Sequence, residues 1–207
     1  MFIAGLFMKH SWRFAFFLLA ATLHGALHAA PLDSARLVHD ARGQIGVTTS
    51  YDPAYRVLPF PMGDVPAHTG VCTDVVVRAY RRQGIDLQAL VNQDMRRAFA
   101  LYPKQWGLRA PDRNIDHRRV PNLQVFFTRH GQKLPVAQQA GNYQAGDLVT
   151  WMLPGARPHI GIVSNKRSAS GTPLVIHNIG RGTQEEDVLF AFPITGHYRY
   201  RPATARP

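Results

Sequence analysis

Residues 147–179 read DLVTWMLPGARPHIGIVSNKRSASGTPLVIHNI and contain three short runs rich in β-branched and aromatic residues. Gly, Pro, Ser and Asn separate these runs, which is typical of antiparallel strands joined by turns. The sequence therefore predicts strands at residues 147–153, 159–165 and 174–179, and a further strand at 194–200.

The residues before this stretch follow a helical period instead. Apolar residues recur on one face within each predicted helix, and Asp or Ser stands before two of them as a cap. Four prolines between Tyr51 and Gly70 exclude a regular element there. Helices followed by strands predict an α+β domain with the helices packed on a mostly antiparallel sheet. The predicted helices are residues 32–45 (capped by Asp33 or Ser34 and stopped by Gly46), 71–83, 87–99 (capped by Asp86), and one opened by Pro121 that ends before Gly131.

The first 29 residues have the order of parts of a secretory signal peptide. Lys9 and Arg13 precede the apolar run 14–23, and small residues follow it. Ten apolar residues are too few to span a bilayer, which needs about 20, although an uncleaved membrane anchor is the alternative. We expect cleavage near Ala29, which leaves residues 30–207 as a single domain in the periplasm without a transmembrane span.

Composition excludes several classes of protein. An apolar content of 45% argues against disorder throughout, and one cysteine cannot form a disulfide within the chain. Removing two cations with residues 1–29 lowers the net charge from +11 to +9, and such a charge attracts polyanions. The basic residues are dispersed, and no nucleic-acid-binding motif accompanies them. We therefore expect an anionic cell-wall polymer or lipid headgroups of the cell envelope as the partner, and no nucleic acid.

Cys72 falls in the first turn of the predicted helix 71–83. Unpaired backbone N–H groups and the helix dipole favour a thiolate at this position. A buried structural thiol is the competing interpretation, because cysteine is among the most buried residue types. Position alone does not separate the two.

Two histidines lie on neighbouring predicted strands. A nucleophilic thiol needs a base, and the base needs a third group to set its tautomer. Because side chains alternate along a strand, His159 and His177 can face the same helix terminus. Gly161 has no side chain on that face and would let the helix of Cys72 approach. Asn178 points the opposite way in a regular strand, so His177 and Asn178 are rival candidates for the orienting role.

These residues occur in blocks whose order resembles that of NlpC-type cell-wall peptidases. The resemblance implies a papain-like cysteine hydrolase that cuts peptide stems of peptidoglycan, needs no cofactor, and uses Cys72 as nucleophile, His159 as base and His177 as the polar third residue. It also implies a tyrosine upstream of the nucleophile, for which we favour Tyr55 over Tyr51. The blocks are Gly70-Val-Cys-Thr-Asp-Val-Val, Gly146-Asp-Leu-Val-Thr-Trp, His159-Ile-Gly-Ile-Val and Val175-Ile-His-Asn.

The mature chain is similar, more closely, to a bacterial family labelled domain of unknown function 1287 (DUF1287), over residues 32–201. This second resemblance is specific but implies little chemistry. It is carried by Tyr51-Asp-Pro-Ala-Tyr, Gly70-Val-Cys-Thr-Asp, Asn114-Ile-Asp-His-Arg-Arg-Val-Pro-Asn, His177-Asn-Ile-Gly and Gly196-His-Tyr-Arg-Tyr.

Two features depart from the peptidase pattern. The peptidases carry Asp-Cys-Ser-Gly where this chain has Val-Cys-Thr-Asp, and the carboxylate of Asp74 would raise the pKa of the thiol unless a cation offsets it. The long loop 102–119 has no counterpart. In it, Arg118 or Arg119 could bind a substrate carboxylate. The alternative is a loop whose charges are solvated or pair with Asp112 and Asp116. The substrate-binding residues that we expect are Tyr55, Asp74, Asn178 and Arg118.

Three hypotheses follow. The first is an exported cysteine amidase or endopeptidase with the triad Cys72, His159 and His177. The second is a non-catalytic basic module that binds the cell envelope and buries its cysteine. The third is a metal site built on the same three residues with His117 or His197, but no closely spaced pair of ligands supports it, so no metal is expected. Two remaining motifs are read as structural: residues 185–187 as a solvated turn, and Phe126-Phe127 as core.

Overall fold

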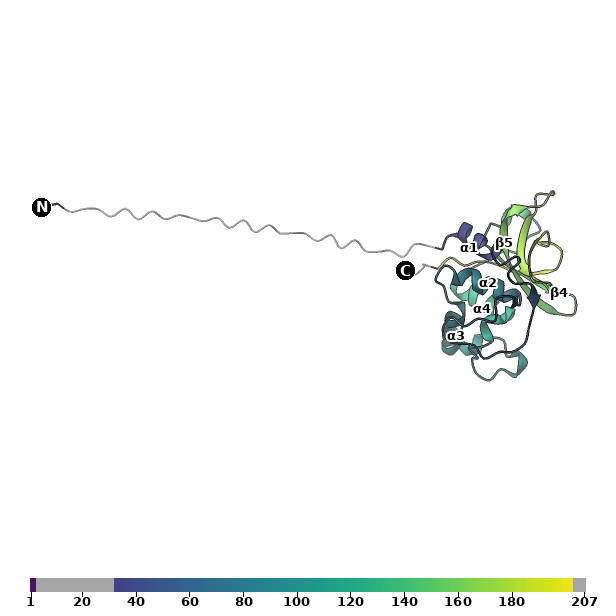
Figure 1. The fold of residues 1–207 in the computed structure, drawn as a ribbon, viewed down its shortest axis with the longest axis horizontal. Coiled ribbons are helices and arrows are strands. Elements are labelled where there is room, and N and C mark those ends of the chain that lie inside the picture. Colours follow the sequence, from purple (N-terminus) through teal and green to yellow (C-terminus); the bar gives the residue numbers. More distant parts are fainter. Residues whose placement is uncertain (3–31, 203–207) are drawn as a thin grey trace.

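The structure, a computed structural model, describes residues 1–2 and 32–202. The expected signal segment, residues 1–29, lies outside the described residues apart from its first two, so it stays a prediction. The backbone N–H of Leu32 donates to the carbonyl of Pro202 (3.2 Å), so the two ends of the described body meet (Figure 1). No described helix is long and apolar enough to cross a membrane.

The four predicted helices are confirmed, with shorter ends. Asp33 and Asp86 cap α1 and α3 by accepting hydrogen bonds from the following backbone N–H groups. The first helix ends at Arg42 with Gly43 as its C-cap, so the prediction that it continues to Gly46 was wrong. Proline stands in the first turn of α4, as its fixed φ allows. The helices are α1 (Ser34–Arg42), α2 (Cys72–Arg81), α3 (Leu87–Ala98) and α4 (Val120–His130).

The strands form a six-stranded sheet in the order β3-β8-β4-β5-β6-β7, in which all neighbours are antiparallel. The four predicted strands are confirmed. Two were missed, β3 and β7, because they are short and rich in Gln, Lys and Glu rather than in apolar residues. The strands are β3 (Gln132–Leu134), β4 (Leu148–Leu153), β5 (Arg157–Arg167), β6 (Pro173–Asn178), β7 (Thr183–Glu186) and β8 (Ile194–Arg199).

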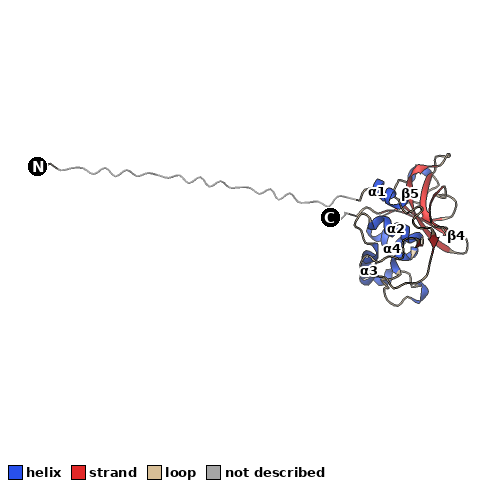
Figure 2. Cartoon of the chain, in the orientation of Figure 1, coloured by secondary structure: helices blue, strands red, loops and turns tan. Residues whose placement is uncertain are grey.

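The helices gather on one side of this sheet, as the α+β prediction requires (Figure 2). Ile160, Ile162 and Ile176 are buried against the helices, and Phe126 and Phe127 lie in the same core, as predicted. Burying each such side chain stabilises the fold by about 1.5–3 kcal/mol. A second, smaller cluster covers the other face of the sheet: Tyr143, Val149, Trp151, Val163, Val175 and Leu189.

A small parallel pair of strands precedes α2. β1 (Ser50–Tyr51) and β2 (Thr69–Gly70) join the two ends of the proline-rich loop, which is otherwise irregular, as predicted. The long loop 102–119 contains two short 3-10 helices, η2 (Gln105–Gly107) and η3 (Asp116–Arg118). Both loops therefore end beside the first turn of α2, where Cys72 lies.

Candidate active site

Cys72 is the first residue of α2 and is only 4% exposed. Burial raises the pKa of its thiol to about 12; a hydrogen bond from the backbone of Ile160 acts against this rise, and the charge of Asp74 adds to it. The resting thiol is thus protonated, because burial outweighs the effect of the helix terminus on its pKa. The contact with Ile160 places the sulfur beside the residue that follows His159.

A cavity of about 340 Å³ borders Cys72. Tyr51 and Tyr55 both line it, but they have different neighbours. Burial, then the adjacent Cys72, raises the pKa of Tyr51, whereas the hydroxyl of Tyr55 donates to Asp112 (3.1 Å). Tyr51 is therefore the tyrosine beside the thiol, whereas Tyr55, which we favoured, lines the same cavity with its hydroxyl on Asp112.

His159 and His177 are hydrogen-bonded to one another. Nε2 of His159 lies 2.8 Å from Nδ1 of His177, and Nε2 of His177 lies 3.0 Å from a carboxylate oxygen of Glu186. The other oxygen of Glu186 accepts from Arg181 (2.6 Å). Both imidazoles are buried, at 3% and 1% exposure. The histidines and Glu186 therefore form one continuous polar chain.

This chain fixes the tautomer of each ring. A carboxylate only accepts hydrogen bonds, so Nε2 of His177 carries the proton and its Nδ1 is an acceptor. Nε2 of His159 must then donate to it, which leaves the lone pair of His159 on Nδ1. Burial lowers the pKa of His159 to about 3 and also lowers that of His177, although Glu186 opposes the second shift. Both rings are thus neutral near pH 7, and His159 has a free basic nitrogen.

The thiol contacts the strand of His159 through the backbone of Ile160. The imidazole of His159 packs against the ring of Trp151 (5.8 Å between centroids), and neither His159 nor His177 is among the described residues that line the cavity.

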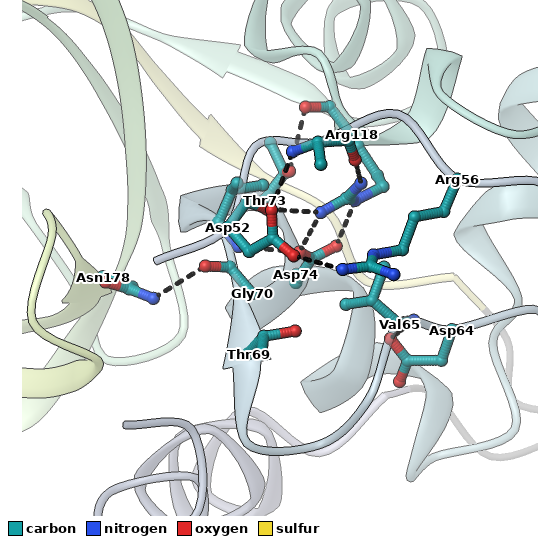
Figure 3. A network of polar contacts seen from close by, with 12 residues as sticks. Asp52, Arg56, Asp64, Val65, Thr69, Gly70, Thr73, Asp74, Arg118 and Asn178 are labelled. Atoms are coloured by element: carbon teal, nitrogen blue, oxygen red, sulfur yellow. Dashed lines mark hydrogen bonds and ion pairs between the residues drawn. The ribbon is translucent and has the colours of Figure 1, made fainter. Parts of the chain in front are cut away.

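Strands β5 and β6 pair at Ile162–Ile176 and beyond, but the register of paired residues does not continue back to His159. The side-chain amide of Asn178 donates to the carbonyl of Gly70 (3.0 Å; Figure 3), which ties the end of β6 to the residue two positions before Cys72. His177, not Asn178, contacts His159, so the orienting position belongs to His177.

Gly161 has a different role from the one that we predicted. A Cβ atom at this position would lie 2.5 Å from a methyl group of Val175 and 3.1 Å from Cβ of His177. Gly161 therefore makes room for β6 and for the imidazole of His177, and not for the helix of Cys72.

Asp74, in the first turn of α2, and Arg118 form a buried ion pair (Figure 3). Nε and Nη2 of Arg118 each lie 2.9 Å from a carboxylate oxygen of Asp74, and the two side chains are 2% and 4% exposed. Asp74 also accepts from the backbone N–H of Val71 (2.7 Å), and Arg118 donates to the carbonyls of Asp52 and Ala54. The pair is neither solvated nor matched with Asp112 or Asp116, and it ties η3 to the first turn of α2.

The buried histidines predict acid sensitivity. His159 has a pKa of about 3 in the folded chain against 6.5 when unfolded, so the unfolded chain binds more protons between these values. Stability then falls as the pH drops below 6.5, by about 1.4 kcal/mol for each pH unit from this residue alone. His117, with a pKa lowered to about 4 by burial, acts in the same direction as His159. Asp116, with a pKa raised to about 6 by burial, opposes both.

Urea unfolding between pH 6.5 and 4 tests this acid sensitivity. The free energy of unfolding should fall less steeply with decreasing pH for His159→Gln than for the wild-type protein. Equal slopes would contradict the buried neutral imidazole.

The described part of the chain contains no group of three or more His, Cys, Asp or Glu side chains that could hold a metal ion. The metal-site hypothesis thus gains no support from the geometry.

The comparison with protein families agrees with the closer of the two resemblances. The model of the family described as "Domain of unknown function (DUF1287)" matches residues 38–200. The chain belongs to the DUF1287 family. Another relative is the "Uncharacterized protein YijF" of Escherichia coli (strain K12), which is 58% identical over 160 residues, or 77% of this chain and 78% of that protein.

Among solved structures, the DUF1287 chain is similar to NlpC1 from Trichomonas vaginalis. The two share 16% sequence identity with a TM-score of 0.45, and the match covers 82% of this chain and 45% of the other. The chain thus spans less than half the length of that protein.

Sequence reasoning missed Glu186. Its run of acidic residues was read as a solvated turn, which was wrong: residues 183–186 form β7, where Glu185 accepts from Arg42 and Glu186 from His177. Gln184 pairs with His177 across β6 and β7, and Glu186 lies two residues further along on the same face. Placing residues 183–186 on a strand beside β6 would therefore have brought Glu186 to the side of the sheet that carries His177. The hydrogen-bonded series His159–His177–Glu186 of this DUF1287 protein thus ends on β7, a strand with no apolar pattern.

Proposed function

We propose that this protein is an exported cysteine hydrolase that cleaves an amide bond in peptidoglycan peptide or a related cell-envelope amide. The observation that carries the proposal is the hydrogen-bonded series Glu186–His177–His159, which leaves a basic nitrogen on the residue next to Ile160, whose backbone contacts the thiol of Cys72. The bordering cavity supplies space for a substrate. Location in the periplasm is part of the proposal and rests on residues 1–29.

The chemistry follows from the resting protonation states. Because the thiol has a pKa of about 12 and His159 one of about 3, the free pair is neutral rather than an ion pair. Proton transfer from Sγ to Nδ1 would therefore accompany attack on the bound carbonyl carbon. His177 and Glu186 stabilise the imidazolium that forms, and backbone N–H groups in the first turn of α2 bind the oxyanion.

Breakdown of the intermediate uses the same groups in reverse. The C–N bond breaks, the amine leaves with the proton from His159, and the acyl group remains on Cys72 as a thioester. Water, deprotonated by His159, then attacks the thioester; the acid leaves and the thiol regains its proton. No other co-reactant is needed.

The product test is direct. Incubating the purified protein with purified peptidoglycan should release fragments whose masses correspond to addition of one water across an amide of the peptide stems. Intact peptide stems after prolonged incubation would overturn the proposal.

One observation favours a second candidate, a non-catalytic basic module for the cell envelope. The deep burial and high pKa of Cys72 are also what a structural thiol would have. A protein that sediments with peptidoglycan equally well with or without Cys72, and releases no fragments, would be such a module.

Glu186 should affect the reaction without contacting substrate. Glu186→Gln keeps an oxygen that accepts from His177 but removes the charge that stabilises the imidazolium, so kcat should fall by about 10-fold or more with little change in KM. The matched control is Asp187→Asn, which removes the same charge from the exposed neighbouring residue. Equal kcat values for Glu186→Gln and the wild type would remove Glu186 from the mechanism.

A further inference from the structure

Arg118 and Arg119 both line the Cys72 cavity, but only the guanidinium of Arg118 makes hydrogen bonds to other described residues. Arg118 is 2% exposed, and its donors are taken by Asp74 and by two backbone carbonyls. The side chain of Arg119, 19% exposed, reaches only one described acid, Asp116, at 3.7 Å, which is too long for a hydrogen bond. Arg119 is therefore the arginine of this wall with donors to spare.

The position of Arg119 is held by an aromatic ring. Its guanidinium carbon lies 4.4 Å from the centroid of the Trp106 ring. Trp106 itself is 56% exposed and has a positive φ of 59°, a backbone conformation that costs free energy for a non-glycine residue. Both residues line the cavity. The loop 102–119 thus holds a strained backbone conformation at Trp106, which places the exposed indole against Arg119.

One nitrogen of this guanidinium is buried without a partner. Nη1 of Arg119 has no hydrogen-bond partner among the described residues, although it is buried from solvent. An unsatisfied donor on a charged group is costly to bury, by about 1–3 kcal/mol or more. No acidic side chain is among the described residues that line the cavity. The wall therefore carries a cation whose nearest described acid lies 3.7 Å away and whose guanidinium makes no hydrogen bond to a described residue.

We propose that Arg119, supported by Trp106, is a carboxylate-binding subsite of this cavity, so that the preferred substrate is a peptide with a free carboxylate near the cleaved amide. The planar guanidinium matches a carboxylate geometrically, and the bond is charge-assisted. The inference rests on the proposed function and deepens it by naming a substrate class. It also moves the carboxylate-binding role that the sequence suggested from Arg118 to Arg119.

The test compares two synthetic peptides that differ in one group. The first is L-Ala-γ-D-Glu-L-Lys with the free α-carboxylate of glutamate, and the second is the same peptide with that carboxylate as a carboxamide. Binding is measured by calorimetry on the Cys72→Ala protein, so that it does not depend on turnover. We expect the acid to bind about 10-fold more tightly or better, as expected for a hydrogen bond to a charged group. Adding Arg119→Gln should reduce this ratio to about one, and Arg119→Lys should leave an intermediate ratio.

The matched control is Arg97→Gln, which removes the same charge from an exposed position on α3 and should leave the acid-to-amide ratio unchanged. The subsite is overturned if the two peptides bind equally, if neither binds, or if Arg119→Gln leaves the ratio intact in a protein with an unchanged melting temperature. The proposed hydrolase activity is tested separately. A wild-type protein that binds the acidic peptide through Arg119 but leaves it uncut would overturn the hydrolase and keep the subsite. Cleavage of both peptides at equal rates would keep the hydrolase and remove the subsite.

Discussion

Cys72→Ala is expected to abolish release of peptidoglycan fragments, with a loss of at least about 10³-fold. The thioester cannot form without the sulfur, and removal of a nucleophile from a catalytic triad costs this much or more. The fold should persist, because the change removes one small buried atom from the first turn of α2, where neighbouring backbone bonds remain. Fragment release is followed by mass spectrometry, and melting temperatures confirm that both proteins are folded.

Thr73→Val is the matched control for this change. The hydroxyl of Thr73 donates to the backbone carbonyl of Arg118 (3.1 Å), so the substitution perturbs the same buried turn without touching the thiol. Thr73→Val should lower stability and retain turnover. Wild-type activity in Cys72→Ala, on the other hand, would remove the thiol from the reaction altogether.

Arg118→Met is expected to lower the free energy of unfolding by about 3–5 kcal/mol. The substitution leaves the carboxylate of Asp74 buried without its partner, which is the costly way to break an ion pair. The double variant Asp74→Leu/Arg118→Met removes both charges, so it should recover much of that loss. Urea denaturation of the single and double variants gives both values.

The surface pair Arg56–Asp52 supplies the comparison. Its nitrogen and oxygen lie 2.7 Å apart, but the side chains are 46% and 25% exposed. Arg56→Met should therefore lower the free energy of unfolding far less than Arg118→Met does, because water screens an exposed pair. A similar small cost for Arg118→Met would mean that the buried pair is not what holds η3 on α2.

The sequence predicted the regular elements because their cores carry strong apolar periods. Strand β5 and helix α2 were found from Ile160, Ile162, Val75 and Val76, all of which are buried between sheet and helix. Strand β7 was missed because its residues are polar, and Glu185 is held by a partner that is distant in sequence, Arg42, 143 positions away. Periodicity detects burial on one face and does not detect such pairings.

The candidate site also has a part that the sequence predicted and a part that it did not. The pairing of His159 with His177 followed from alternation on adjacent strands, which is a local rule. The ion pair of Arg118 with Asp74 and the choice of Tyr51 over Tyr55 depend on how two long loops return to α2, and no local pattern encodes that return. The sequence likewise left open whether burial or the helix terminus would dominate the pKa of Cys72, since the answer depends on what covers the thiol.

The most direct test of the account is covalent labelling of the thiol by a substrate-like electrophile. A stem peptide whose scissile carbonyl is replaced by a chloromethyl ketone should alkylate the wild-type protein with loss of chloride, which adds the mass of the reagent less HCl, with Cys72 as the modified residue after digestion. His159→Gln should slow this labelling by about 100-fold or more, because the neutral thiol then has no base. Equal labelling rates in the two proteins, or a modified residue other than Cys72, would contradict the pairing of Cys72 with His159.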